Sequence, residues 1–155
     1  SEEAEVSTKA AIEKDPNNAV LYSVLGSLYD AKANPKDGKT LPEEEMMKWY
    51  DLAESAYKTS IEKDPKFFDS YFNIGVLYNN RAAYIYDKIA NITDDNKYNE
   101  AKKGADDIYL KAVPYFEKAH ELRPDDKATM QQLKKLYAKT GDTDKYNAMK
   151  QLLGE

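Results

Sequence analysis

Few side chains in this sequence are of the types that carry out acid–base, nucleophilic or metal chemistry. The 155 residues contain one histidine, His120, and no cysteine. The lack of cysteine excludes disulfides, thiolate nucleophiles and zinc sites with cysteine ligands. His120 stands near the end of a segment with a helical pattern, where a cation complements the negative end of the helix dipole. We interpret it as a structural or exposed residue rather than as a general base.

Acidic and polar motifs in the sequence do not meet the requirements of known sites. Residues 94–96, Asp-Asp-Asn, begin like a calcium loop, but the glycine at the sixth place and the glutamate at the twelfth are absent. The glutamates at 43–45 are expected to stabilise a helix N-terminus. Residues 91–93, Asn-Ile-Thr, form a glycosylation sequon, which matters only if a eukaryote secretes the chain. We therefore expect no catalytic residue, no cofactor and no metal.

The charge pattern restricts the class of partner. The formal net charge is −5, from 23 basic and 28 acidic residues. Two lysine pairs, at 102–103 and 134–135, are too short and too balanced by acids to form a nucleic-acid track. No apolar run approaches about 18 residues, so no direct membrane insertion is expected. Residues 1–16 are acidic and helical in pattern, which is not typical of a signal peptide. The cytoplasm and the bacterial periplasm or envelope both remain as locations.

The sequence contains an internal repeat whose copies are anchored on prolines. Residues 12–16 recur word for word at 61–65, which is 49 residues further on, and a looser third copy ends at Pro124. Ten residues after each of the first two prolines stands a glycine, Gly26 or Gly75. Thirteen residues after each proline stands a tyrosine, at Tyr29, Tyr78 and Tyr137. The register is constant around each proline, so the extra length must lie after the tyrosine and before the next alanine.

With this pattern the chain resembles the tetratricopeptide repeat family, whose period is about 34 residues. The longer spacings imply insertions of about 15 and about 25 residues, at the turn between the two helices of a repeat. Long insertions of this kind resemble bacterial members of the family. The third copy is degenerate, because Lys134 stands at the glycine position and Tyr146 at the alanine position. The matching residues are Tyr22, Leu25, Gly26, Tyr29, Ala53, Tyr57, Ser60, Pro65, Tyr71, Ile74, Gly75, Tyr78, Ala112, Phe116, Ala119, Pro124, Leu133 and Tyr137.

The resemblance implies an all-α fold, a right-handed α-α superhelix (a solenoid) of antiparallel helix pairs with one long protruding helical hairpin. We expect a single domain, in which residues 1–16 are the second helix of a partial leading repeat. Residues 17–65 and 66–124 are two repeats with insertions, and 125–155 are a C-terminal repeat or cap. Helical spacing past Tyr78 and a break at 93–96 predict a hairpin with helices of about 25 residues each.

Local signals predict how the insertions are built. Residues 34–39 have the composition of a loop, and Thr40 with Glu43 predicts a capping box at the start of the following helix. Pro114 lies in a segment that is otherwise strongly helical. It predicts a kink within a long helix, with a fresh helix start at Ala112 as the alternative.

The two repeated glycines predict a close approach between helices. Glycine inside a helix costs about 1 kcal/mol relative to alanine, and such a cost is tolerated where a neighbouring side chain would otherwise collide. We expect the small residues Ala53 and Ala112 of the second helices to face Gly26 and Gly75. The buried face of the first helix is predicted from steps of three and four residues, at Leu21, Val24, Leu25 and Leu28.

The family resemblance also implies that the first helix of each repeat lines a concave surface that holds a partner. The outward-facing residues there would be Ser23, Ser27, Asp30, Phe72, Asn73, Val76, Asn79, Asn80, Gln131 and Lys135, followed by Lys139. Asparagine offers a donor and an acceptor to a peptide backbone, whereas Phe72 and Val76 suit an apolar side chain. Asn79 and Asn80 equally fit a solvated helix end, and Phe72 equally fits packing on a neighbour.

The expected function is that of a non-catalytic protein–protein interaction scaffold that binds a peptide or protein partner, and not that of an enzyme. The alternative is a structural or assembly subunit that self-associates, or docks in a larger complex, through the protruding hairpin or the exposed leading helix. Some family members grip a C-terminal carboxylate with lysine, arginine and two asparagines. Asn73 matches one of those asparagines, but no cation stands where that clamp needs one, so binding of that type is not expected.

Overall fold

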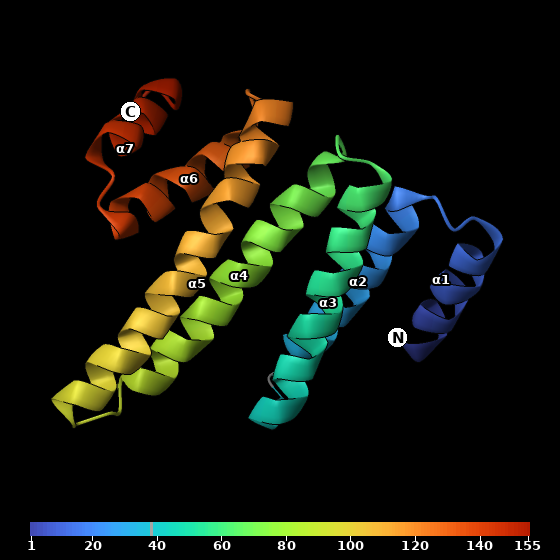
Figure 1. Cartoon of the computed structure of the whole chain (residues 1–155), viewed down its shortest axis with the longest axis horizontal. Helices are drawn as coiled ribbons and strands as arrows, with labels where there is room; N and C mark the ends of the chain where they lie inside the picture. Colours follow the sequence, from blue (N-terminus) through green and yellow to red (C-terminus); the bar gives the residue numbers. More distant parts are fainter. Residues whose placement is uncertain (38) are drawn as a thin grey trace. The chain divides into compact units, whose positions relative to one another are not determined.

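The computed structural model describes residues 1–37 and 39–155, so Gly38, within the loop predicted at 34–39, lies outside the described residues. In the described part the fold is all-α (Figure 1). Its helices are α1 (Glu2–Lys14), α2 (Ala19–Ala33), α3 (Glu43–Lys63), α4 (Phe68–Ile89), α5 (Asp95–Leu122), α6 (Lys127–Thr140) and α7 (Thr143–Leu152). The chain divides into two compact units, Ser1–Leu77 and Tyr78–Glu155, and the boundary between them falls within α4.

Three helices end in the same way, directly before a proline. The C-cap residues of α1, α3 and α5 are Asp15, Asp64 and Arg123, with φ between −139° and −136° and ψ between 75° and 97°. Their backbones are extended because the ring of the following proline excludes helical angles from the residue before it. The repeated proline therefore ends the helix at the same place in each copy.

The tyrosines of the sequence repeat have matching environments. The Tyr22 hydroxyl donates a hydrogen bond to the Pro16 carbonyl at 3.0 Å, and the Tyr71 hydroxyl donates to the Pro65 carbonyl at 2.9 Å. In both copies the bond ties the first helix to the turn that precedes it. Three further tyrosines at equivalent positions are all buried, namely Tyr29, Tyr78 and Tyr137.

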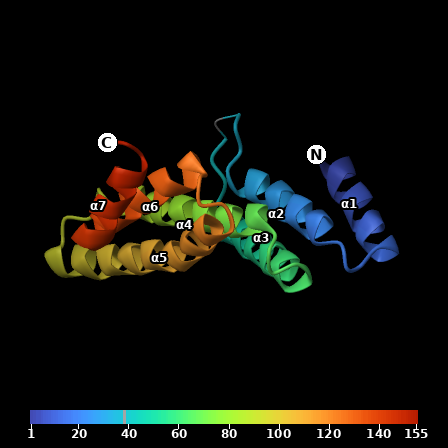
Figure 2. The same cartoon turned by 90° about the horizontal axis from the view of Figure 1, so that it is seen from above.

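In the first unit, α2 and α3 lie side by side, and Figures 1 and 2 show this pair from two directions. The buried Ser60 hydroxyl of α3 donates to the Ala19 carbonyl of α2 at 2.7 Å and accepts from the Ser70 hydroxyl of α4 at 2.6 Å. α1 packs on α2 and is joined to it by Glu5, whose carboxylate accepts hydrogen bonds from Tyr29 and Lys32.

In the second unit, the C-terminal part of α4 runs beside α5 (Figure 2). Two tyrosine pairs connect these helices, Tyr78 with Tyr115 and Tyr86 with Tyr109, each with ring centroids 5.7 Å apart. α6 packs against α5, and α7 packs against α6. The helices of the predicted hairpin have 22 and 28 residues, and the Asp94 side chain caps α5 by accepting from the Lys97 N–H at 2.9 Å.

The structure tests two local predictions about helix starts, of which the second is wrong. α5 runs as one long helix through Pro114, as predicted, so the alternative of a fresh start at Ala112 does not hold. α3 begins at Glu43, with Pro42 as its N-cap and no side-chain capping bond, so Thr40 and Glu43 do not form a capping box. The physical reason is position, because Thr40 stands two residues before the N-cap. The three glutamates of the first turn remain to complement the helix dipole.

Candidate functional site

A groove in the first unit lies between α2 and the beginning of α4, and we name it the α2–α4 groove. Its volume is about 360 Å³. The lining residues are Val20, Ser23, Val24, Ser27 and Leu28 from α2, with Phe67, Asp69, Phe72 and Asn73 from α4 and the turn before it. Four of the predicted partner-binding residues are therefore brought together, namely Ser23, Ser27, Phe72 and Asn73.

Helical spacing explains why these side chains meet. On α2 the lining residues recur at steps of three and four, which places them on one face of the helix. On α4 the residues Asp69, Phe72 and Asn73 follow the same spacing. The Phe72 ring is held in place by stacking on Phe68, with centroids 5.9 Å apart and an angle of 21° between the planes. Each helix thus provides one wall of the groove, and each wall has both polar and apolar side chains.

Tyr57 of α3 supports the α2 wall from behind. It is only 1% exposed, and its hydroxyl lies 3.1 Å from the Ser27 hydroxyl. Burial raises the pKa of Tyr57 to about 12, although the hydrogen bond with Ser27 acts in the opposite direction. The phenol therefore stays neutral near pH 7 and serves as a fixed hydrogen-bonding support for Ser27.

Gly26 meets this tyrosine and not the small residue that the sequence predicted. A Cβ atom at Gly26 would lie 2.6 Å from the Cδ1 and Cε1 atoms of Tyr57. Ala53 is fully buried, but the close neighbour of Gly26 is an aromatic ring, so the prediction of a small facing residue is wrong for this position. The glycine allows a flat ring to lie directly against the α2 backbone. Gly75 is also buried.

Asp30 lies one turn beyond the lining residues of α2 and is half-buried. Burial raises the pKa of its carboxyl group, and the hydrogen bond from Asn34 lowers it in part. The Asn34 amide donates to Asp30 Oδ1 at 2.8 Å, while the Tyr50 hydroxyl donates to Asn34 Oδ1 at 2.7 Å. Asp30 is thus part of a network that joins the end of α2 to α3, and it does not line the groove.

The other predicted partner-binding residues do not line the groove. Val76 is half-buried further along α4. Asn79 donates to Gln132 Oε1 at 3.1 Å, which ties α4 to α6 within the second unit, and Asn79 Oδ1 is buried with no hydrogen-bond partner in the described part of the chain. Asn80 is exposed in that unit, as are Gln131 and Lys135 on α6.

Sequence reasoning missed five lining residues, of which Val20 and Val24 are the most informative. They are 50% and 43% exposed, so the prediction that Val24 belongs to a buried face is wrong. A signal for them was present, because α2 carries apolar residues at 20, 21, 24, 25 and 28. This stripe is wider than one buried face requires. The remaining missed residues are Leu28, Phe67 and Asp69.

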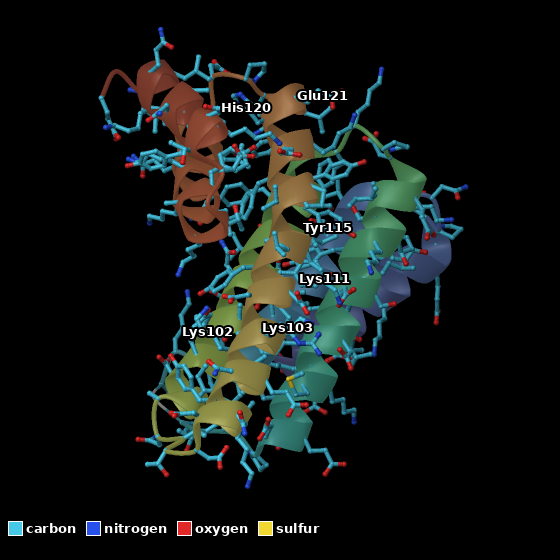
Figure 3. All side chains as sticks on the ribbon, turned by 60° about the vertical axis from the view of Figure 1, so that its left-hand side comes forward. Lys102, Lys103, Lys111, Tyr115, His120 and Glu121 are labelled. Carbon is cyan, nitrogen blue, oxygen red and sulfur yellow. The ribbon has the colours of Figure 1, made fainter. Side chains whose placement is uncertain are left out.

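The structure holds no arrangement typical of metal binding in the residues it describes, since no three histidine or acidic side chains cluster there. His120 lies in the last turn of α5, half-buried, and its Nδ1 is buried without a hydrogen-bond partner among the described residues. Figure 3 shows it beside Glu121 at the end of α5 opposite to Lys102 and Lys103. Across the same described residues, no helix is long and apolar enough to cross a membrane.

Comparison with known proteins agrees with this fold. Residues 56–103, which run from the middle of α3 through α4 into α5, match the family model of the tetratricopeptide repeat. Two solved structures of monomeric mutants of IFIT1 are similar in fold. The mutant with Gppp-AAAA has a TM-score of 0.56 and 18% sequence identity, and the mutant with m7Gppp-AAAA has 0.57 and 15%.

The alignment with each IFIT1 structure covers 96% of this chain, and this chain spans 36% of the length of the IFIT1 chain. At such identities the likeness is one of fold alone. No curated protein sequence matches the chain. The match at residues 56–103 and the paired helices agree with the repeated proline, glycine and tyrosine positions, so this part of the chain is similar to the tetratricopeptide repeat.

Proposed function

We propose that this chain is a non-catalytic scaffold that binds a peptide segment of a partner protein in the α2–α4 groove. One observation carries the proposal: side chains from two helices that are about 50 residues apart in sequence line one groove, and two valines stay exposed in it. Exposed apolar side chains that gather in a concavity are typical of an interaction site. The tetratricopeptide repeat, as a scaffold for interactions, supports the same proposal.

The lining chemistry suits a peptide with an apolar anchor. Val20, Val24 and Phe72 offer apolar surface to a side chain of the partner. The Asn73 amide provides a donor and an acceptor for the partner backbone, and the Ser27 hydroxyl adds a second polar contact. A volume of about 360 Å³ lies at the low end for ligand pockets, so the groove takes one or two anchor side chains.

A protein partner fits the groove better than a nucleic acid does. No lysine or arginine lines it, and Asp69 does. The unit that contains it, Ser1–Leu77, has fifteen acidic and nine basic residues, a net charge of −6. Phosphate binding depends on cations, which this lining lacks. The IFIT1 structures with Gppp-AAAA and m7Gppp-AAAA share only the fold with this chain, so their ligand is not transferred to it.

Selection of peptides from a random displayed library with the 155-residue chain tests the proposal. Peptides that bind the native chain should lose most of their affinity for Val24→Asp, which puts a charge into the apolar wall. Val6→Asp is the matched control, because Val6 is 64% exposed on α1 and does not line the groove. The proposal is wrong if the selected peptides bind Val24→Asp as tightly as the native chain, or if Val6→Asp weakens them equally.

A further inference from the structure

A second concavity lies in the second unit, where the last turn of α6 meets the middle of α5, and we name it the α5–α6 corner. Its volume is about 230 Å³, and it is lined by Asp106, Tyr109 and Leu110 of α5 with Lys139 and Thr140 of α6. The corner exists because α5 starts at Asp95, three to four turns before it meets the end of α6 at Tyr109. In Figure 1 the α4–α5 pair runs on past the end of α6.

The carboxylate of Asp106 is already neutralised by its neighbours. The Lys102 ammonium donates to its Oδ2 at 2.7 Å, and the Tyr86 hydroxyl donates to its Oδ1. The hydrogen bond from Lys102, followed by that from Tyr86, lowers the pKa of Asp106. Lys102 approaches from α5 itself, on the part of the helix nearer to the α4–α5 turn (Figure 3). Asp106 therefore has both oxygens occupied; the charge of the second cation of the corner, Lys139, lowers its pKa as well, but the two groups form no ion pair.

That second cation is Lys139. Its ammonium lies 4.6 Å from the ring centroid of Tyr109 and 5.8 Å from that of Tyr86, so the two rings hold it at the corner by cation–π attraction. No described carboxylate lies within ion-pair distance of it. α6 itself contains no acidic residue, so no carboxylate of the same helix competes for Lys139.

An exposed apolar side chain borders this cation. Leu110 is 51% exposed, although the adjacent Tyr109 is buried at 8%. An exposed leucine that lines the same corner as an ammonium without an ion pair fits a ligand that offers a carboxylate beside an aliphatic group. The volume of the corner limits that ligand to about one or two side chains.

We propose that the α5–α6 corner binds an acidic side chain of a partner peptide, whose carboxylate pairs with Lys139 while a neighbouring aliphatic side chain covers Leu110. A nucleic acid fits less well. Lys139 lies over the rings of Tyr109 and Tyr86, where a base would otherwise stack. It is the only cation among the residues that line the corner, so it can pair with a single carboxylate but gives a chain of phosphates no track of cations.

Two end-capped peptides test this site by nuclear magnetic resonance titration of the 155-residue chain. One is acetyl-Gly-Glu-Leu-Gly-amide, and the other replaces its glutamate by glutamine. The acidic peptide should shift the backbone signals of Tyr109, Leu110, Lys139 and Thr140, and the glutamine peptide should bind about fivefold more weakly, as expected for the loss of one ion pair.

Variants separate the corner from general charge attraction. Lys139→Gln should weaken the acidic peptide about fivefold. Lys135→Gln is the matched control, with the same loss of charge one turn earlier on α6, and it should leave binding unchanged. Leu110→Ser should weaken both peptides, because it removes the apolar contact that they share. Val24→Asp in the α2–α4 groove should not change the binding of either peptide at the corner. A negative result at the corner is therefore distinct from a failure of peptide binding in the α2–α4 groove.

Three results would overturn the proposal. The first is equal binding of the two peptides, and the second is an equal loss in Lys135→Gln and Lys139→Gln. The third is a stronger shift of the same four signals by a short oligoadenylate, which would assign the corner to phosphate.

Discussion

Gly26 shows how one residue controls the distance between two helices. The Tyr57 ring occupies the space that a side chain at Gly26 would need, and the ring cannot move away because it is buried and bonded to Ser27. Protein interiors are packed so closely that one extra carbon atom changes the stability of the fold. The glycine therefore lowers the helix propensity of α2 but allows α2 to pack closely on α3.

Replacing Gly26 by leucine should lower the free energy of unfolding by about 2 kcal/mol, because overpacking outweighs the gain in helix propensity. Gly104→Ala is the control. Gly104 is exposed within α5 and a Cβ there meets nothing within 4 Å, so alanine should raise stability by about 1 kcal/mol. Urea unfolding measures both. An unchanged midpoint for Gly26→Leu would contradict the packing of Tyr57 against this helix.

Glu5 should make stability depend on pH. Hydrogen bonds from Lys32 and then Lys9 lower the pKa of its carboxyl group from 4.5 to about 2. A carboxyl whose pKa is lower in the folded state stabilises the fold above the unfolded pKa, and this contribution is lost as pH falls through the folded pKa. Glu5→Gln should therefore lower the melting temperature at pH 7, and the difference should shrink steadily between pH 4.5 and pH 2.

Thermal melts at pH 7 and near pH 2 measure this effect. Glu13→Gln is the control, because Glu13 is exposed on the same helix and forms no hydrogen bond or ion pair with α2 among the described residues. A difference between Glu5→Gln and the native chain that persists at the acid end would show that the carboxylate charge is not what joins α1 to α2.

At the scale of elements, α5 contains a proline that destabilises the interior of the helix. Pro114 has no N–H to donate to the Leu110 carbonyl, yet α5 runs through it. Pro114→Ala restores this donor at an exposed position and should raise the free energy of unfolding by about 2 kcal/mol, after allowance for the stiffer unfolded chain that proline gives. Lys111→Ala, exposed on the same helix, should change it little. A loss of stability in Pro114→Ala would mean that the packing of α5 requires the proline.

Helix ends are the features of the elements that local sequence determines best. The extended C-cap residues before the three prolines follow from a clash within two residues, so they hold whatever surrounds them. The start of α3 was harder to predict, because Thr40 with Glu43 is a plausible local signal, yet the helix begins at Glu43 with Pro42 as its N-cap. The position of such a helix start depends on how the helix packs against its neighbours, and not on the local sequence alone.

At the scale of the whole molecule, charge is divided unequally between the two units. Ser1–Leu77 has a net charge of −6, and Tyr78–Glu155, with fourteen basic and thirteen acidic residues, has +1. Peptides selected on the α2–α4 groove should therefore carry basic residues beside the apolar anchor. Their affinity should fall about fivefold between 20 and 300 mM salt, since screening weakens attraction between exposed charges. Isothermal titration with a neutral-flanked peptide of the same anchor is the control, and equal salt dependence for both would contradict the role of charge.

The repeat, the all-α class, the helix ends and the long hairpin were readable from the sequence. They rest on contacts between near neighbours and on a register that recurs around each proline. The tertiary structure decided which face of α2 stays open, that Tyr57 and not a small residue lies on Gly26, and that Lys139 meets Tyr109. These contacts join segments that are tens of residues apart, so they depend on where each helix ends and on how the helices pack, and no spacing within one segment contains that information.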